Sequence, residues 1–173
     1  MLRLQHFCHS RISWGLLALS GVGLELAALY FQYIMDLAPC VMCIYIRVAV
    51  LGLILAGLIG MLQPKRWFIR FVGISSWLVS SIWGLRLAYD LNDMQVNPSP
   101  FATCSFYPEF PSFMPLDVWL PSVFSPTGMC SDSVWTFLSV SMAQWMMVCF
   151  AVYILLALIV LFPALTRSKT SNK

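Results

Sequence analysis

The chain has 173 residues, of which 60% are hydrophobic and 10% are charged, and its formal net charge is +3. Soluble domains average roughly 45–50% apolar and about 25% charged residues, so this composition excludes an ordinary soluble domain. The sequence also contains no Gly-rich phosphate loop, no nucleotide fingerprint and no basic cluster suited to nucleic acid. We therefore expect a membrane protein that contacts lipid and binds no nucleic acid.

Four apolar segments are each long enough to cross a bilayer, which takes about 20 residues. We predict spans at about 12–32, 41–62, 68–89 and 144–162. The connections between the first three spans are short, and short connections make consecutive helices antiparallel. The predicted fold is an all-α membrane protein, an antiparallel bundle of four transmembrane helices that forms one membrane domain over residues 1–173. A long irregular loop at about 90–143 joins its third and fourth helices.

Positive charges predict the orientation of this bundle. They lie before the first span, around the connection 63–67 and after the last span (Arg3, Arg11, Lys65, Arg66, Arg70, Arg167, Lys169 and Lys173). Cytoplasmic segments carry an excess of such residues, so both termini and the loop 63–67 are predicted to be cytoplasmic. Loops 33–40 and 90–143 then face the periplasm. A cleaved signal peptide is the alternative for the N-terminus, but the apolar segment is long and we expect it to stay attached.

A CxxC pair stands where the second span is predicted to begin. Cys40 and Cys43 follow Pro39, and Arg47 lies four residues after Cys43, on the same face of the helix. The free N–H groups and the positive dipole end of the helix, together with this cation, favour the thiolate, which is the form that attacks disulfides. The spacing therefore predicts a redox-active pair. Snorkelling to the membrane interface is the alternative interpretation of Arg47.

The remaining cysteines separate by their predicted side of the membrane. Cys104 and Cys130 lie in the outer loop, where an oxidising compartment lets disulfides persist, whereas we expect Cys8 and Cys149 to have no catalytic role. Together with the CxxC pair, the loop cysteines allow three pairings. A static disulfide framework and a four-thiolate zinc site are the alternatives to thiol exchange. Exchange is favoured because closely spaced cysteines beside a cation make a poor permanent link.

Two further features are open to interpretation. Glu25 lies in the outer half of the first span, where we expect an ion pair or hydrogen bond within the bundle, or a role as proton acceptor. The outer loop holds seven of the ten prolines, so most of it is predicted to be extended and able to enter the groove of a partner. Within it, residues 116–124 are predicted to form a short helix on the membrane surface, interrupted by Pro121.

The sequence resembles the DsbB family of bacterial inner-membrane thiol oxidases over essentially its whole length. The features that carry the resemblance are the four-span layout, the later Cys130 and the runs Pro39-Cys40-x-x-Cys43-x-x-x-Arg47 and Pro98-Ser99-Pro100-Phe101-Ala102-Thr103-Cys104. The resemblance implies that Cys43 engages a quinone ring, with Arg47 associated with quinone binding, and that Cys40 exchanges with a second disulfide formed by Cys104 and Cys130. A reduced DsbA-like partner would attack Cys104.

The implied function is a protein-dithiol:quinone oxidoreductase in the bacterial inner membrane. It would reoxidise a periplasmic DsbA-like thiol oxidase and pass the electrons to ubiquinone or menaquinone. One departure is that many relatives have an acidic residue immediately before the arginine, where this chain has Ile46. A thiol or quinone reductase related to vitamin K epoxide reductase, and a non-enzymatic scaffold with a disulfide-linked outer loop, are the alternatives.

Overall fold

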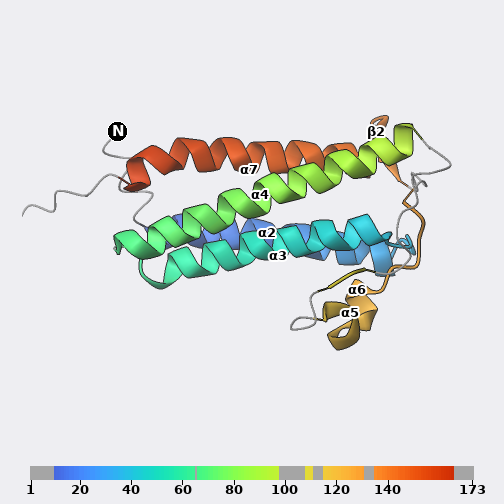
Figure 1. The fold of residues 1–173 in the computed structure, drawn as a ribbon, viewed down its shortest axis with the longest axis horizontal. Coiled ribbons are helices and arrows are strands. Elements are labelled where there is room, and N and C mark those ends of the chain that lie inside the picture. The colour runs from blue at the N-terminus through green and yellow to red at the C-terminus, as the bar shows by residue number, and fades with distance from the viewer. Residues whose placement is uncertain (1–9, 65, 98–107, 111–114, 131–134, 166–173) are drawn as a thin grey trace, which may run out of the picture.

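The computed structural model describes residues 10–64, 66–97, 108–110, 115–130 and 135–165. Within these ranges, four long helices run side by side (Figure 1): α2 (Arg11–Tyr33), α3 (Val41–Leu62), α4 (Trp67–Val96) and α7 (Met142–Leu165). All four are long and apolar enough to cross a membrane. The predicted fold, a four-helix membrane bundle, is confirmed, and the protein is a multi-pass membrane protein.

Helix α4 continues seven residues beyond the predicted end of the third span, Tyr89, to Val96. The hydropathy of the sequence marks only the part of a helix that suits lipid, and the last two turns of α4 carry polar residues such as Asp90, Asn92 and Asp93. A helix needs no apolar surface to continue once it has left the bilayer. The predicted single membrane domain and its exact spans stay predictions.

Close approach of the helices depends on small residues. Helix α3 packs between α2 and α4, and α4 packs against α7. A Cβ atom on Gly84 of α4 would overlap the ring of Phe150 on α7, and one on Gly57 of α3 would lie 2.7 Å from the backbone nitrogen of Ala18 on α2. Lipid tails provide little hydrophobic drive between helices, so such close packing contributes much of the association.

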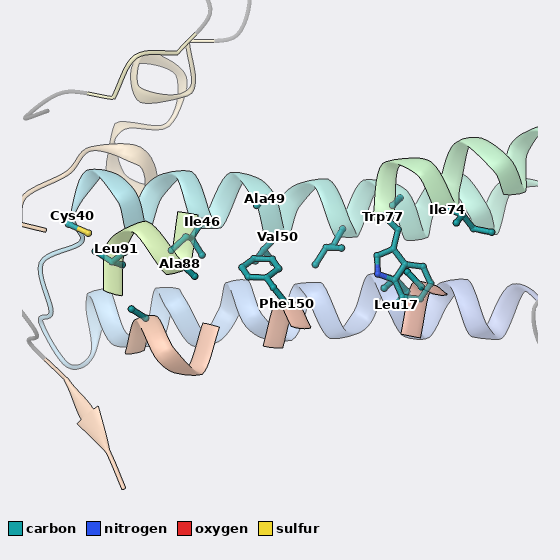
Figure 2. Close-up of a cluster of buried hydrophobic side chains, with 14 of the residues drawn as sticks. Leu17, Cys40, Ile46, Ala49, Val50, Ile74, Trp77, Ala88, Leu91 and Phe150 are labelled. Carbon is teal, nitrogen blue, oxygen red and sulfur yellow. The ribbon is translucent and has the colours of Figure 1, made fainter. Parts of the chain in front are cut away.

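The buried core runs along the length of the bundle (Figure 2). Trp77 and Ile74 of α4 lie toward one end, and Phe150 and Val50 meet in the middle. Cys40 lies at the opposite end of the same cluster, near Leu91. The CxxC motif is therefore attached to the buried core of the bundle.

The described parts of the long loop contain more regular structure than we predicted. The predicted helical character of residues 116–124 and its interruption at Pro121 are confirmed: they form two single-turn helices, α5 (Leu116–Trp119) and α6 (Pro121–Phe124). Their position on the membrane surface stays a prediction. A two-stranded antiparallel hairpin, β1 (Thr136–Phe137) and β2 (Val140–Ser141), leads directly into α7. In Figure 1 these elements lie at the end of the bundle where α3 begins, opposite the start of α2.

Candidate functional site

Helix α3 begins at the CxxC pair. Cys40 is the N-cap residue, with extended backbone angles (φ −83°, ψ 168°), and its sulfur accepts a hydrogen bond from the Cys43 backbone N–H at 3.2 Å. Polar N-cap side chains accept such a bond at many helix starts, and here a sulfur takes that place. The two sulfur atoms lie 2.6 Å apart. The helix start thus brings both cysteines together and directs free backbone N–H groups toward them.

The two sulfurs have different environments. Cys40 is 4% exposed. The hydrogen bond to the Cys43 sulfur, followed by burial, raises the pKa of the Cys40 thiol well above its usual range. A reduced Cys40 therefore keeps its proton at neutral pH, which leaves Cys43 as the better nucleophile of the pair.

Arg47 is buried by protein groups and only 6% exposed. Its Nη1 donates hydrogen bonds to Gln32 Oε1 at 2.6 Å and to the carbonyl oxygen of Val123 at 2.9 Å, and its Nη2 donates to the carbonyl oxygen of Ala28 at 3.1 Å. The guanidinium also interacts electrostatically with Glu25 and with the Cys43 sulfur. One cation therefore connects α2, α3 and α6, which is not the geometry of an arginine that reaches out to solvent.

A cavity of about 250 Å³ lies beside the two sulfurs. It opens among all four long helices and the loop, and most of its wall is apolar. Side chains that line it include Glu25, Phe31, Cys40, Cys43, Arg47, Val50, Leu91, Gln95, Met129, Trp135, Met146 and Cys149. The Oε1 atoms of Glu25 and Gln95 are buried and lack hydrogen-bond partners among the described residues.

Hydrogen bonds hold the outer loop against the end of α2 and the connection that follows α2. The Ser122 carbonyl accepts hydrogen bonds from Gln32 Nε2, at 2.9 Å, and from the Tyr33 hydroxyl. The backbone N–H groups of Thr127 and Gly128 both donate to the Pro39 carbonyl. We call residues 121–128 the docked segment. It leads directly to Cys130, which is disulfide-bonded, 3% exposed and part of the same buried cluster as Cys40.

The structure brings together most of the predicted site residues. Cys40, Cys43 and Arg47 line one cavity, and Cys130 is buried in the cluster that includes Cys40. Cys104, the run 98–104 that contains it, and Cys8 lie outside the described residues, so the predicted pairing of Cys104 with Cys130 stays a prediction. Which of these residues react also stays a prediction.

Sequence reasoning missed several residues of this site. Gln32 and Gln95 received no role, although for Gln32 an amide at the end of an apolar span was an available signal. Cys149, which we expected to have no catalytic role, is a free, half-buried cysteine in the cavity wall, and its lack of a catalytic role stays a prediction. Glu25 was expected to form an ion pair or hydrogen bond, or to accept a proton. The Arg47 guanidinium interacts with it electrostatically, its Oε1 atom has no hydrogen-bond partner among the described residues, and a role as proton acceptor stays a prediction.

A bundle of four helices suited to a membrane that holds a CxxC pair beside an apolar cavity is the arrangement expected of a membrane-embedded thiol–disulfide oxidoreductase. The family model for Disulfide bond formation protein DsbB matches residues 10–160. The chain therefore belongs to the DsbB family, the proteins of disulfide bond formation.

Close relatives are found along the whole chain. Disulfide bond formation protein B of Shewanella frigidimarina (strain NCIMB 400) is 74% identical over 98% of this chain and 100% of the relative. The proteins of the same name from Shewanella denitrificans and Shewanella amazonensis are 57% and 59% identical, over 99% and 94% of this chain and 98% and 96% of the relatives. The resemblance expected from the sequence motifs is confirmed.

Proposed function

We propose that this protein reoxidises a periplasmic DsbA-like dithiol oxidase and passes the electrons to a membrane quinone. It does so in the bacterial inner membrane, and both of its termini lie in the cytoplasm. The observation that carries the proposal is that Cys40, Cys43 and Arg47 line one apolar cavity while Cys130 is buried in the cluster that contains Cys40. A route from a protein disulfide to a lipid-soluble acceptor needs these parts to lie close together.

The proposed sulfur chemistry proceeds by successive exchange. A thiolate of the reduced partner attacks Cys104 in a disulfide with Cys130, and the partner leaves oxidised, so that Cys104 and Cys130 become thiols. Cys130 then attacks Cys40 of the Cys40–Cys43 disulfide and releases the Cys43 thiolate. Cys104 attacks Cys130 in the resulting Cys40–Cys130 disulfide, which reforms the loop disulfide, releases Cys40 and leaves a Cys40–Cys43 dithiol. The raised pKa of Cys40 keeps a proton on this sulfur, so that Cys43 faces the acceptor as the reactive member of the pair.

The cavity suits the head group of a quinone. Its volume of about 250 Å³ is close to the lower end of ordinary ligand sites, which start at roughly 300 Å³, and its wall is mostly apolar. A guanidinium has five N–H groups, of which Arg47 uses two on Nη1 and one on Nη2. In the described part of the chain, its Nε–H and its second Nη2–H remain available to a carbonyl oxygen.

Ubiquinone and menaquinone both have such an oxygen and an apolar ring. When bound, either supplies a two-electron, two-proton acceptor that dissolves in lipid. The residues of this chain then have separate tasks: Cys43 delivers the electrons, Arg47 stabilises negative charge on a ring oxygen where water is scarce, and the apolar wall orients the ring.

Purified protein, a reduced DsbA-like partner and a short-chain ubiquinone test the proposal together. We expect one quinol to form for each partner disulfide, and we expect Cys43→Ser to stop this reaction while Cys8→Ser leaves it unchanged. A non-enzymatic scaffold would consume no thiols, and a reductase would instead reduce its partner with electrons from the quinol. Either result would overturn the proposal.

A further inference from the structure

Four buried side-chain atoms in the described residues have no hydrogen-bond partner: Glu25 Oε1, Trp77 Nε1, Asn92 Oδ1 and Gln95 Oε1. Buried polar groups are usually paired, so each exception needs an explanation. Two of the four, those of Glu25 and Gln95, belong to residues that line the cavity beside the CxxC pair. The other two belong to residues outside the cavity wall. A molecule in the cavity therefore offers an explanation for Glu25 and Gln95 alone.

Both atoms are hydrogen-bond acceptors, and this limits the ligand. The oxygen atoms of an oxidised quinone ring are themselves acceptors and have no hydrogen to give. The reduced ring, a hydroquinone, has two hydroxyl groups and donates from both. Arg47 is the opposite case, since it is a pure donor with N–H groups to spare, and it suits the oxidised ring. A hydroxyl oxygen also accepts hydrogen bonds, so the cavity contains a donor that suits either redox form and acceptors that suit only the reduced one.

The two acceptors come from different helices. Glu25 is on α2, one helical turn before Ala28, whose carbonyl oxygen binds the Arg47 guanidinium. Gln95 is in the last turn of α4. With Arg47 on α3, three helices contribute charged or amide side chains to a space whose wall is mostly apolar. Acceptors on separate helices suit a ring with hydroxyl groups at opposite positions.

We infer that Glu25 and Gln95 accept hydrogen bonds from the hydroxyl groups of a hydroquinone in this cavity, so that the site recognises the reduced ring as well as the oxidised one. The inference rests on the proposed function. Oxidation of the Cys40–Cys43 dithiol to a disulfide releases two electrons and two protons, and forming the two hydroxyl groups takes up the same number. Glu25 and Gln95 are then binding residues for the product of the transfer.

Equilibrium binding tests this without turnover. Isothermal titration calorimetry on the full chain in detergent, oxidised and under argon, gives dissociation constants for ubiquinone-1 and ubiquinol-1. The variants are Glu25→Leu, Gln95→Leu, the conservative Glu25→Gln, and Asn92→Leu. The last is the matched control, because Asn92 also has an unpartnered buried oxygen on α4 but does not line the cavity.

We expect Glu25→Leu and Gln95→Leu each to weaken ubiquinol-1 binding about fivefold or more, as fits the loss of one hydrogen bond, and to change ubiquinone-1 binding less than twofold. Glu25→Gln, which keeps an acceptor oxygen, should recover most of the loss. Asn92→Leu should match the unmodified protein for both rings. Equal weakening of both forms, or no weakening of either, would overturn the inference.

Cys149 provides a second measurement that locates the ring. This free cysteine lines the same cavity, so bound ubiquinone-1 should slow its alkylation by a lipophilic maleimide, followed residue by residue with mass spectrometry. If the unmodified protein binds neither ring form and Cys149 is not protected, the proposed quinone site is refuted together with the inference. If ubiquinone-1 protects Cys149 but each variant changes the affinities for ubiquinone-1 and ubiquinol-1 by the same factor, only the inference fails.

Discussion

Replacing Arg47 by methionine removes the charge while keeping a side chain of similar length. The change removes three hydrogen bonds, to Gln32, Val123 and Ala28, and the N–H groups available to a quinone oxygen. Loss of one preorganised donor to a developing oxyanion typically lowers kcat by about 10²–10³, or roughly 2.7–4 kcal/mol of barrier. We expect quinone reduction by Arg47→Met to slow about 100-fold. Arg47→Lys, which keeps the charge but not the planar geometry, should lose less.

Two rates separate the role of Arg47 at the cavity from a general loss of structure. Stopped-flow absorbance of the quinone follows its reduction, and trapping of the mixed disulfide with the reduced partner follows exchange at the loop. Arg70→Met is the matched control, because Arg70 is an equally buried arginine, 3% exposed, that binds the Pro64 carbonyl far from the cavity. We expect exchange to stay within about threefold in both variants. Normal quinone kinetics in Arg47→Met would refute the reasoning.

Three other outcomes follow from the packing and the site. Gly84→Leu should lower the stability of the bundle by about 1–3 kcal/mol, because the new side chain meets a buried ring from α7. Gly23→Leu is the control and should not lower it, because a Cβ atom there meets no atom within 4 Å. Thermal unfolding in detergent measures the stability of both variants. In the reduced protein, iodoacetamide should label Cys43 before Cys40 at neutral pH, because the raised pKa of Cys40 keeps the proton on its sulfur, and labelling of Cys40 should accelerate at alkaline pH. Equal labelling of the two cysteines at neutral pH, measured by mass spectrometry, would contradict this. Tyr33→Phe removes a hydrogen bond to the docked segment and should speed hydrogen exchange in α6, and unchanged exchange would show that this bond does not hold the segment.

Local sequence patterns were enough to predict the frame of the site. Hydropathy predicted four helices because each helix must satisfy its backbone within itself and cover it with apolar side chains in lipid. The spacing of Cys43 and Arg47 predicted that these two residues share a helix face, because four residues make about one turn. The structure agrees with both, since Cys40 caps α3 and the side chains of Cys40, Cys43 and Arg47 line one cavity.

Contacts between distant segments were decided only by the tertiary structure. The sequence indicates that Arg47 faces Cys43, but its bonds to Gln32 and Val123 depend on how α2 and the docked segment pack against α3. The same holds for Gln95 and Cys149, which no local sequence pattern marks as site residues. They line the cavity because α4 and α7 turn the helix faces that carry them toward it. Periodicity sets which residues share a face, whereas the packing of whole helices selects the face that meets the site, and this selection is a property of the complete bundle.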